Sequence, residues 1–176
     1  MRRLLAAIVA ILLLGCASTT VQSKRDPEFT GPLDRLYVAV GYSSVEESYA
    51  AELATHLSKL LGDHGITTRH QVFDQGEEDL SLAAIDAPVL DTAALREFLP
   101  NGVLIVSETA ATWQRRTFRE LRDVSHDASL FVPWKPDRIW RASLVTDEHG
   151  DDVNRASMKT TAETIVKQLL ADKLID

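Results

Sequence analysis

The chain contains a single cysteine, Cys16, and no cysteine follows it in the sequence. A fold built from the later residues therefore has no internal disulfide, and side-chain packing must stabilise it. The composition allows this, because 45% of the 176 residues are hydrophobic and 26% are charged, as in ordinary globular domains. Since aromatic residues make up only 6% of the chain, we expect one domain with a core of Leu, Val, Ile and Ala.

Cys16 follows an apolar segment at the start of the chain. Arg2 and Arg3 precede an uninterrupted apolar run over residues 4–14. A run of this length falls well below the ~20 residues that span a bilayer, and it is typical of a signal-peptide core. The alternatives are an ordinary signal peptide without lipid attachment and an amino-terminal anchor helix.

The apolar segment ends in Leu-Leu-Gly-Cys at 13–16, which resembles the lipobox of bacterial lipoproteins. The resemblance implies cleavage between Gly15 and Cys16, a diacylglyceryl group on the Cys16 thiol, and acylation of the new amino group by a fatty acid such as palmitate. Leu14 departs from the small residue usual at its place in the motif. Ala17 follows the cysteine, and in this family the absence of Asp there favours transfer to the outer membrane. We therefore expect a stable lipid anchor on the periplasmic face of the outer membrane.

Residues 16–32 are expected to form the lipidated cysteine and a flexible tether. The segment after Cys16 is polar, contains Pro27 and Pro32, and shows no apolar periodicity. Fully stretched, such a tether would reach ~50 Å. The globular domain is then expected to cover residues 33–176.

From residue 33 onward, strand patterns and helix patterns alternate. The pattern predicts a strand at 36–41 and then, after a capping box at Ser44 and Glu47, a helix with one apolar face. Gly62 and Gly65 end this helix before a second strand at 66–73. The later predicted elements are a helix at 92–99, strands at 102–113 and 139–145, an irregular segment with a short strand at 129–132, and a closing helix with the apolar stripe Met158, Ala162, Ile165 and Leu169.

A strand, a helix and a strand this close together predict a βαβ unit with parallel strands. We therefore predict an α/β fold, with α+β as the alternative: one domain of two or three layers, a mixed sheet of about four to five strands, and a carboxy-terminal helix. The order of elements resembles small periplasmic α/β lipoprotein domains, such as the curli-secretion lipoprotein, the penicillin-binding-protein activators and the amino-terminal domain of the Tol-system propeller protein. The resemblance covers residues 33–176 as an order of elements, without a shared motif, and it implies partner binding.

Catalytic, metal-binding and nucleotide-binding motifs are weak in this sequence. The segment 41–44 contains Ser43 and Ser44 but lacks the second glycine of a G-x-S-x-G nucleophile elbow. The histidines form no H-E-x-x-H motif, and the acidic stretch 147–152 around His149 lacks the spacing of a calcium loop. Glycine-rich phosphate loops are missing as well. We expect no catalytic residue, no metal and no cofactor.

The charges of the chain are segregated. Without Arg2 and Arg3, 17 basic residues face 26 acidic ones, so the net charge changes from −7 to −9, which disfavours nucleic acid as a partner. Segment 74–91 holds six acidic residues and no basic one. A basic cluster lies further along the chain and consists of Arg115, Arg116, Arg119 and Arg122, close to Trp113.

Arginine beside an aromatic residue is a common combination at protein interfaces. The arginine cluster with Trp113 is therefore a candidate partner-binding surface. Alternatively, it pairs with the acidic segment inside the fold, or both segments are solvated faces. Trp134, between Pro133 and Lys135, is a further candidate for an exposed contact, whereas Trp140 alternates with Ala142 and Leu144 and is expected in the core.

Together these observations predict a membrane-anchored periplasmic lipoprotein that docks an envelope protein partner. Its lipid anchor would raise the local concentration of the domain at the membrane without any need for catalytic residues. The alternatives are a carrier or binder of a lipid or small envelope ligand and, third, a periplasmic hydrolase.

Overall fold

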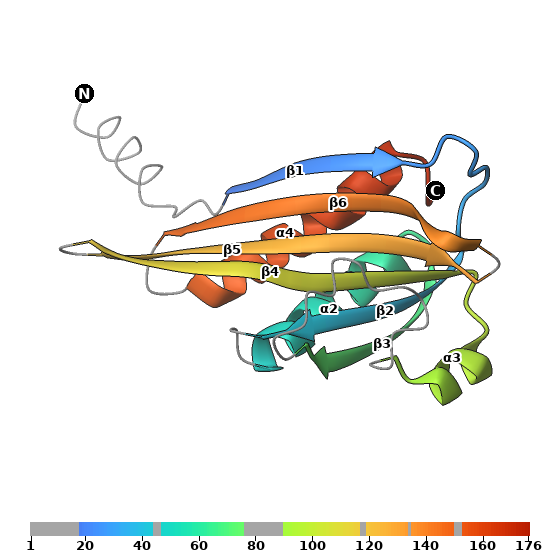
Figure 1. The fold of residues 1–176 in the computed structure, drawn as a ribbon, viewed down its shortest axis with the longest axis horizontal. Helices are drawn as coiled ribbons and strands as arrows, with labels where there is room; N and C mark the ends of the chain where they lie inside the picture. Colours follow the sequence, from blue (N-terminus) through green and yellow to red (C-terminus); the bar gives the residue numbers. More distant parts are fainter. Residues whose placement is uncertain (1–17, 44–46, 76–89, 117–118, 134, 150–152) are drawn as a thin grey trace, which may run out of the picture.

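The computed structural model describes residues 18–43, 47–75, 90–116, 119–133, 135–149 and 153–176. Its strands are β1 (Ser18–Arg25), β2 (Arg35–Tyr42), β3 (Thr67–Asp74), β4 (Gly102–Arg116), β5 (Arg119–Val132) and β6 (Lys135–His149). Its helices are α2 (Glu47–Asp63), α3 (Thr92–Phe98) and α4 (Val153–Ala171). The six strands form one mixed sheet in the order β1-β6-β5-β4-β2-β3, shown in Figure 1.

The amino-terminal half of the fold is the predicted βαβ unit. β2 pairs with β3 in parallel, and α2 connects them. The helix ends at Asp63, and Gly65 then adopts a φ of 78°, a left-handed conformation that suits glycine. Ser44, the first residue of the predicted capping box, lies outside the described residues, whereas Glu47 begins α2.

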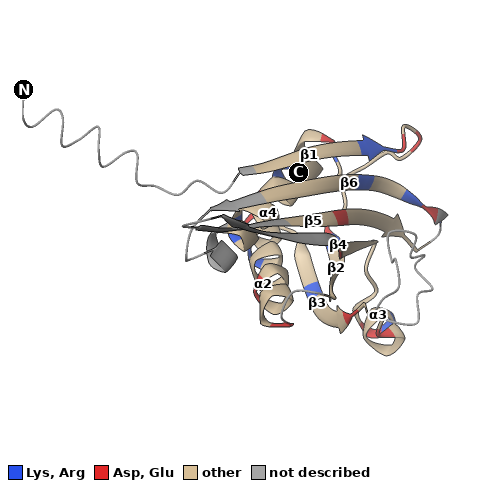
Figure 2. Ribbon diagram, turned by 60° about the vertical axis from the view of Figure 1, so that its left-hand side comes forward, with Lys and Arg blue, Asp and Glu red and all other residues tan. Residues whose placement is uncertain are grey.

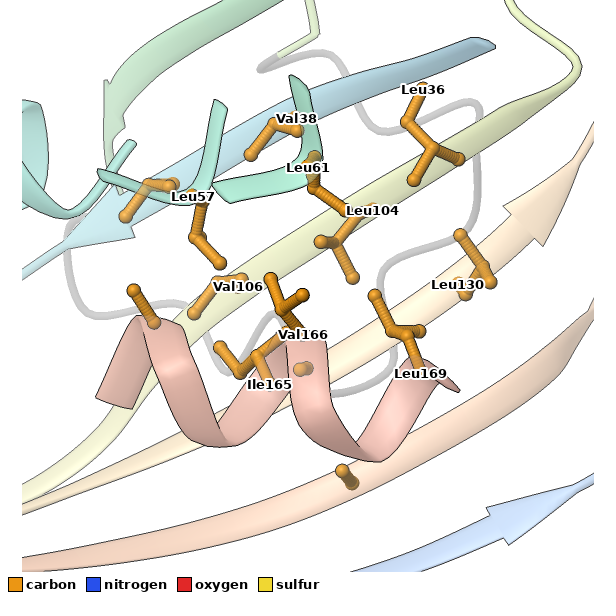
Figure 3. Packing of buried hydrophobic residues seen from close by; sticks show 14 of the residues in the cluster. Leu36, Val38, Leu57, Leu61, Leu104, Val106, Leu130, Ile165, Val166 and Leu169 are labelled. Carbon is orange, nitrogen blue, oxygen red and sulfur yellow. The ribbon is translucent and has the colours of Figure 1, made fainter. Parts of the chain in front are cut away.

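The main core lies between the sheet and two long helices. α2 and α4 pack on the same face of the sheet, and their apolar residues meet those of β2, β4, β5 and β6. Figure 3 shows this packing for Leu57 and Leu61 of α2, Ile165, Val166 and Leu169 of α4, and Leu36, Val38, Leu104, Val106 and Leu130 of the sheet. The stripe predicted for the closing helix is confirmed, because Met158, Ala162, Ile165 and Leu169 are all buried.

A second, smaller core lies on the opposite face of the sheet. There Ala94 of α3 packs with Tyr37, Ile105 and Phe131. α3 begins at Asp91, whose Oδ1 accepts hydrogen bonds from the backbone N–H groups of Ala93 (3.0 Å) and Ala94 (2.9 Å). The fold is therefore a three-layer α/β domain in which the third layer covers only part of the sheet.

Two predictions about the strands are wrong. The segment expected to be a flexible tether contains β1, an edge strand paired antiparallel with β6 from Ser18 to Arg25, so the domain begins well before residue 33. The segment expected to be irregular contains β5, a strand of 14 residues at the centre of the sheet. With these strands the sheet has six members instead of four or five.

Candidate functional site

The second face of the sheet is exposed along β1 and β6. Alternate residues of β1, namely Thr20, Gln22 and Lys24, are exposed, as are Ser143 and Val145 of β6. Apart from Val145, which is 42% exposed, these residues are polar. An antiparallel part of a sheet commonly packs one face on the core and leaves the other in contact with water, as β1 and β6 do here.

A hollow lies at one end of this exposed face. It has a volume of about 460 Å³ and is lined by Lys24, Arg25, Asp26, Pro27, Arg138, Ile139, Trp140 and Arg141. We call it the basic hollow, because four of the eight lining residues are cationic and one is acidic. Figure 2 shows basic segments of β1 and β6 lying side by side at this place.

Arg141 is held in the basic hollow by an ion pair with Asp127 of the neighbouring strand β5. The Asp127 side chain is only 6% exposed, and its second carboxylate oxygen accepts a hydrogen bond of 2.6 Å from Ser143. A buried carboxylate needs such partners, since burial without them is strongly unfavourable. Asp127 therefore orients the guanidinium group of Arg141.

Asp26 of the same hollow pairs with Lys135. The hydrogen bond from Lys135 and a second from the backbone N–H of Glu28 (2.9 Å) hold the pKa of Asp26 below its ordinary value. The same contact raises the pKa of Lys135. Asp26 thus stays ionised, and its charge is already balanced by a cation outside the lining of the hollow.

Behind the basic hollow, Asp172 joins three parts of the fold. Its Oδ2 accepts hydrogen bonds from the indole N–H of Trp140 (2.7 Å), from Ser23 of β1 (2.8 Å) and from Gln168 of α4 (3.2 Å). Arg25 donates to the backbone carbonyl of the same residue (2.5 Å). Burial raises the pKa of Asp172, but the three hydrogen bonds outweigh this effect and lower it overall. We call these contacts the Asp172 clasp, since they fix β1 to the end of α4.

Buried polar residues also gather where β2 and β3 end. Gln75 bonds both backbone groups of Glu108: it accepts from the N–H (2.8 Å) and donates to the carbonyl (3.1 Å). The Glu108 carboxylate accepts the N–H of Ser43 (3.1 Å), and Glu108 pairs in register with His126. The His126 ring stacks on Tyr49 at a centroid distance of 6.0 Å.

Ligands of open α/β sheets often bind at the carboxyl ends of the parallel strands. At this end, however, Gln75, Glu108 and Ser43 are hydrogen-bonded to one another, which gives the cluster a structural role. Gly41 contributes to it, because a Cβ at that position would lie 2.5 Å from the Gln75 side chain. Within the described ranges, no group of three or more His, Cys, Asp or Glu side chains could hold a metal ion.

The residues predicted from the sequence as a partner-binding surface lie at the β4–β5 hairpin. Trp113 pairs in register with Arg122, and Arg116 with Arg119 at the tip, so Trp113 and the four arginines share one hairpin end. Trp134, Gly15 and Cys16 lie outside the described residues, as do residues 76–89 of the acidic segment. Trp140 is buried at 1% exposure, as its alternation predicted.

Sequence reasoning missed the basic hollow and the Asp172 clasp. Each brings together residues that are more than 100 positions apart in the sequence, such as Lys24 and Arg141. A local sequence pattern cannot predict that such residues become neighbours in the fold. The one local signal was the alternation of Asp127 with Ser129 and of Arg141 with Ser143, which marks two strands with a polar face.

These observations define a mixed α/β domain with two long helices on one face of the sheet and a partly exposed polar second face. Among solved structures, the chain is similar to the PelC dodecamer from Paraburkholderia phytofirmans, with a TM-score of 0.53 and 15% sequence identity over 90% of this chain and 100% of that one. A second structure of PelC from the same organism gives a TM-score of 0.50. The lipoprotein GNA1162 from Neisseria meningitidis gives 0.48, with 15% identity over 78% of this chain and 98% of that one.

At this level of identity, the likeness to PelC shows a shared fold. No protein-family model matches the chain, and no curated protein is significantly similar to it in sequence. Among the helices that the described ranges contain, none combines the length and the apolar character needed to cross a membrane.

Proposed function

We propose that this chain is a bacterial lipoprotein, anchored through Cys16 to the periplasmic face of the outer membrane, whose domain serves as a non-catalytic docking or accessory subunit of an envelope assembly. The lipobox-like residues 13–16 and the PelC-like fold both support this proposal. The observation that carries it is the start of β1 at Ser18, two residues after the cysteine.

The position of β1 changes how the anchor would act. Two residues span at most about 7 Å, so a lipid on Cys16 would hold the sheet directly against the membrane surface. The domain would then search a thin layer beside the bilayer rather than the ~50 Å that a free tether would allow. A partner would therefore be one that is itself embedded in, or bound to, the same membrane.

The strand register supports a role for the β4–β5 hairpin in the layer beside the membrane. We call this hairpin the arginine hairpin, because its end carries Arg115, Arg116, Arg119 and Arg122. Ser18 pairs with Asp147, which pairs with Asp123, so these three residues lie level across the sheet. From Asp123 the hairpin continues by four residues to Arg119, about 13 Å at the rise of a β-strand. The start of β1 and the hairpin tip lie at the same end of the sheet in Figure 1. The arginine hairpin thus extends about 13 Å beyond the level of Ser18, which is further than the roughly 7 Å that the two residues from Cys16 to Ser18 can span.

The test compares three forms of the full chain expressed in bacteria: wild type, Cys16→Ser, and Arg115→Glu with Arg116→Glu. We expect wild type in the membrane fraction and the Cys16→Ser chain to be lost from it. The variant Arg115→Glu with Arg116→Glu (the hairpin variant) should remain in the membrane with an unchanged melting temperature. When cells are treated with a chemical cross-linker, it should lose the cross-linked products that wild type gives. Lys59→Glu with Lys167→Glu, which reverses two exposed charges on the helices, is the control.

Each outcome decides a separate part of the proposal. If Cys16→Ser fractionates and migrates like wild type, the lipid anchor is wrong. If the hairpin variant keeps its cross-linked products, the docking surface is wrong. Products at multiples of the mass of the cleaved, lipidated chain would indicate assembly of the chain with itself, and other masses would indicate a different partner. Loss of stability in the hairpin variant would instead support pairing of these arginines inside the fold.

A further inference from the structure

Polar groups, rather than apolar packing, hold the inner side of β1. Val21 is the only apolar residue among the eight of β1, and it is only partly buried against the main core. On either side of it, Thr19 bonds Thr146 at 2.9 Å and Ser23 bonds Asp172 at 2.8 Å. Water can replace such hydrogen bonds, so each of them stabilises a docked strand less than a fully buried apolar side chain would.

The core on this side of the sheet is complete without β1. β1 is an edge strand and pairs with β6 alone in the described sheet. Its register partners Ala142 and Leu144 belong to the main core, where α4 packs on β6. These contacts between β6 and α4 persist when β1 leaves. An edge element with few buried apolar contacts opens at a lower free energy than the core does.

The chain that follows β1 is attached to the domain at two points. The backbone N–H of Asp26 donates to the carbonyl of Ile139 at 2.8 Å, and the Asp26 carboxylate pairs with Lys135. Further on, the N–H of Leu33 donates to the carbonyl of Leu174 at 2.7 Å. The domain therefore keeps its hold on Asp26 when β1 detaches, and the segment that becomes free is β1 itself.

We propose that β1 is a retractable tether, which detaches from β6 as a unit and lets the domain move away from the membrane surface. This inference rests on the proposed lipid anchor at Cys16. With β1 docked, two residues separate the anchor from the sheet; with β1 detached, the ten residues from Cys16 to Asp26 span at most about 35 Å. The Asp172 clasp sets the balance between the two states, because it joins Ser23 of β1 to α4. Detachment is a thermal opening of one edge strand and needs no pull from the membrane.

Trypsin detects the detached state, because it cleaves after Lys and Arg and requires an unfolded segment. Within residues 17–34, Lys24 and Arg25 are its only sites, and both lie in β1. The lipidated full chain is inserted into phosphatidylcholine vesicles and treated with trypsin. The domain released from the vesicles is quantified, and mass spectrometry identifies the cut in β1. When opening and closing are faster than cleavage, the rate of release follows the population of the detached state.

A disulfide between β1 and β6 provides the lock that the test needs. Gln22 and Ser143 are exposed and lie opposite each other in the register, so Gln22→Cys with Ser143→Cys places two cysteines within reach of a disulfide. The same protein after reduction is the matched control. Ser23→Ala weakens the Asp172 clasp, and Gln22→Thr is its control at an exposed position of the same strand.

We expect the oxidised lock to slow the release of the domain at least tenfold and reduction to restore the wild-type rate. Ser23→Ala should speed the release about fivefold, the effect of one hydrogen bond of ordinary strength, and Gln22→Thr should change it less than twofold. Release that the oxidised lock does not slow, or an equal effect of the two single variants, would overturn the retractable tether.

Hydrogen exchange of the full chain in a neutral detergent measures the same opening without a membrane. The amides of β1 that pair with β6 should exchange at least 100-fold faster than the paired amides of β2 and β4. Equal exchange in β1 and β4 would mean that β1 opens only when the whole domain unfolds, which overturns the proposal. Failure of wild type to insert into the vesicles would instead refute the lipid anchor, so the two failures are distinguishable.

Discussion

Substitution of Asp172 by Ala should release the edge strand from the carboxy-terminal end of the fold. The carboxylate accepts three hydrogen bonds at one oxygen, from Trp140, Ser23 and Gln168. Alanine leaves the indole N–H of Trp140, a residue that is 1% exposed, without its acceptor. It also separates Ser23 of β1 from Gln168 of α4, so the strand and the helix lose their shared partner.

The magnitude follows from these contacts. A buried donor without an acceptor costs about 1–3 kcal/mol, and each of the two half-buried hydrogen bonds contributes about 0.5–1 kcal/mol. We therefore expect the free energy of unfolding to decrease by about 3 kcal/mol, which lowers the Tm of a domain of this size by roughly 6–12 °C. The measurement is urea and thermal unfolding followed by circular dichroism.

Two comparisons make the reasoning refutable. Asp172→Asn keeps an oxygen that can accept from Trp140 and should lose clearly less stability than the alanine variant. Asp63→Ala removes a carboxylate that is 59% exposed and forms an exposed ion pair with Lys59, so the free energy of unfolding should change by no more than about 0.5 kcal/mol. Hydrogen exchange should become faster first in β1. An alanine variant as stable as the Asp63→Ala control, or an equal loss in the Asn and Ala variants, would refute the argument.

Two further predictions concern backbone space and acid stability. Gly41→Ala should decrease the free energy of unfolding by about 1–3 kcal/mol, because the new methyl group would lie 2.5 Å from the Gln75 side chain. Gly62→Ala should increase it by about 0.5 kcal/mol, because a Cβ there has nothing within 4 Å. Thermal melts of both variants would measure these changes, and an unchanged Tm of Gly41→Ala would contradict the prediction for Gly41. Because the pKa of Asp172 is lowered on folding, its contribution is complete above the ordinary carboxyl pKa and is lost as the pH falls through the lowered value. The stability of Asp172→Asn, measured against pH, should therefore decline less steeply in acid than that of wild type, and parallel curves would contradict this assignment.

The βαβ unit and the closing helix could be predicted because their residues repeat with clear periods. In α2 the buried residues recur every three or four positions, and in β2 an apolar run is buried on both faces. Such patterns depend only on the burial of local side chains, which the sequence reports directly.

β1 and β5 escaped prediction because polar residues occupy their inward positions. The inward residues of β1 include Thr19, which bonds Thr146, and Ser23, which bonds Asp172. In β5 the inward His126 interrupts the apolar series from Val124 to Leu130. A hydrophobicity pattern reads these positions as polar and exposed, although tertiary hydrogen bonds and ring stacking make them part of the interior.

The antiparallel pairing of β1 with β6 also has a mechanical consequence. A pull on the chain ahead of Ser18, as a membrane anchor on Cys16 would transmit, acts along the axis of β1 and loads its eight registered pairs in shear. In that geometry the interstrand hydrogen bonds carry the force together instead of opening one after another. The Asp172 clasp lies at the far end of the same strand, where it opposes the slip of β1 along β6. The strand that resists shear thus begins directly at the point where a membrane anchor on Cys16 would pull.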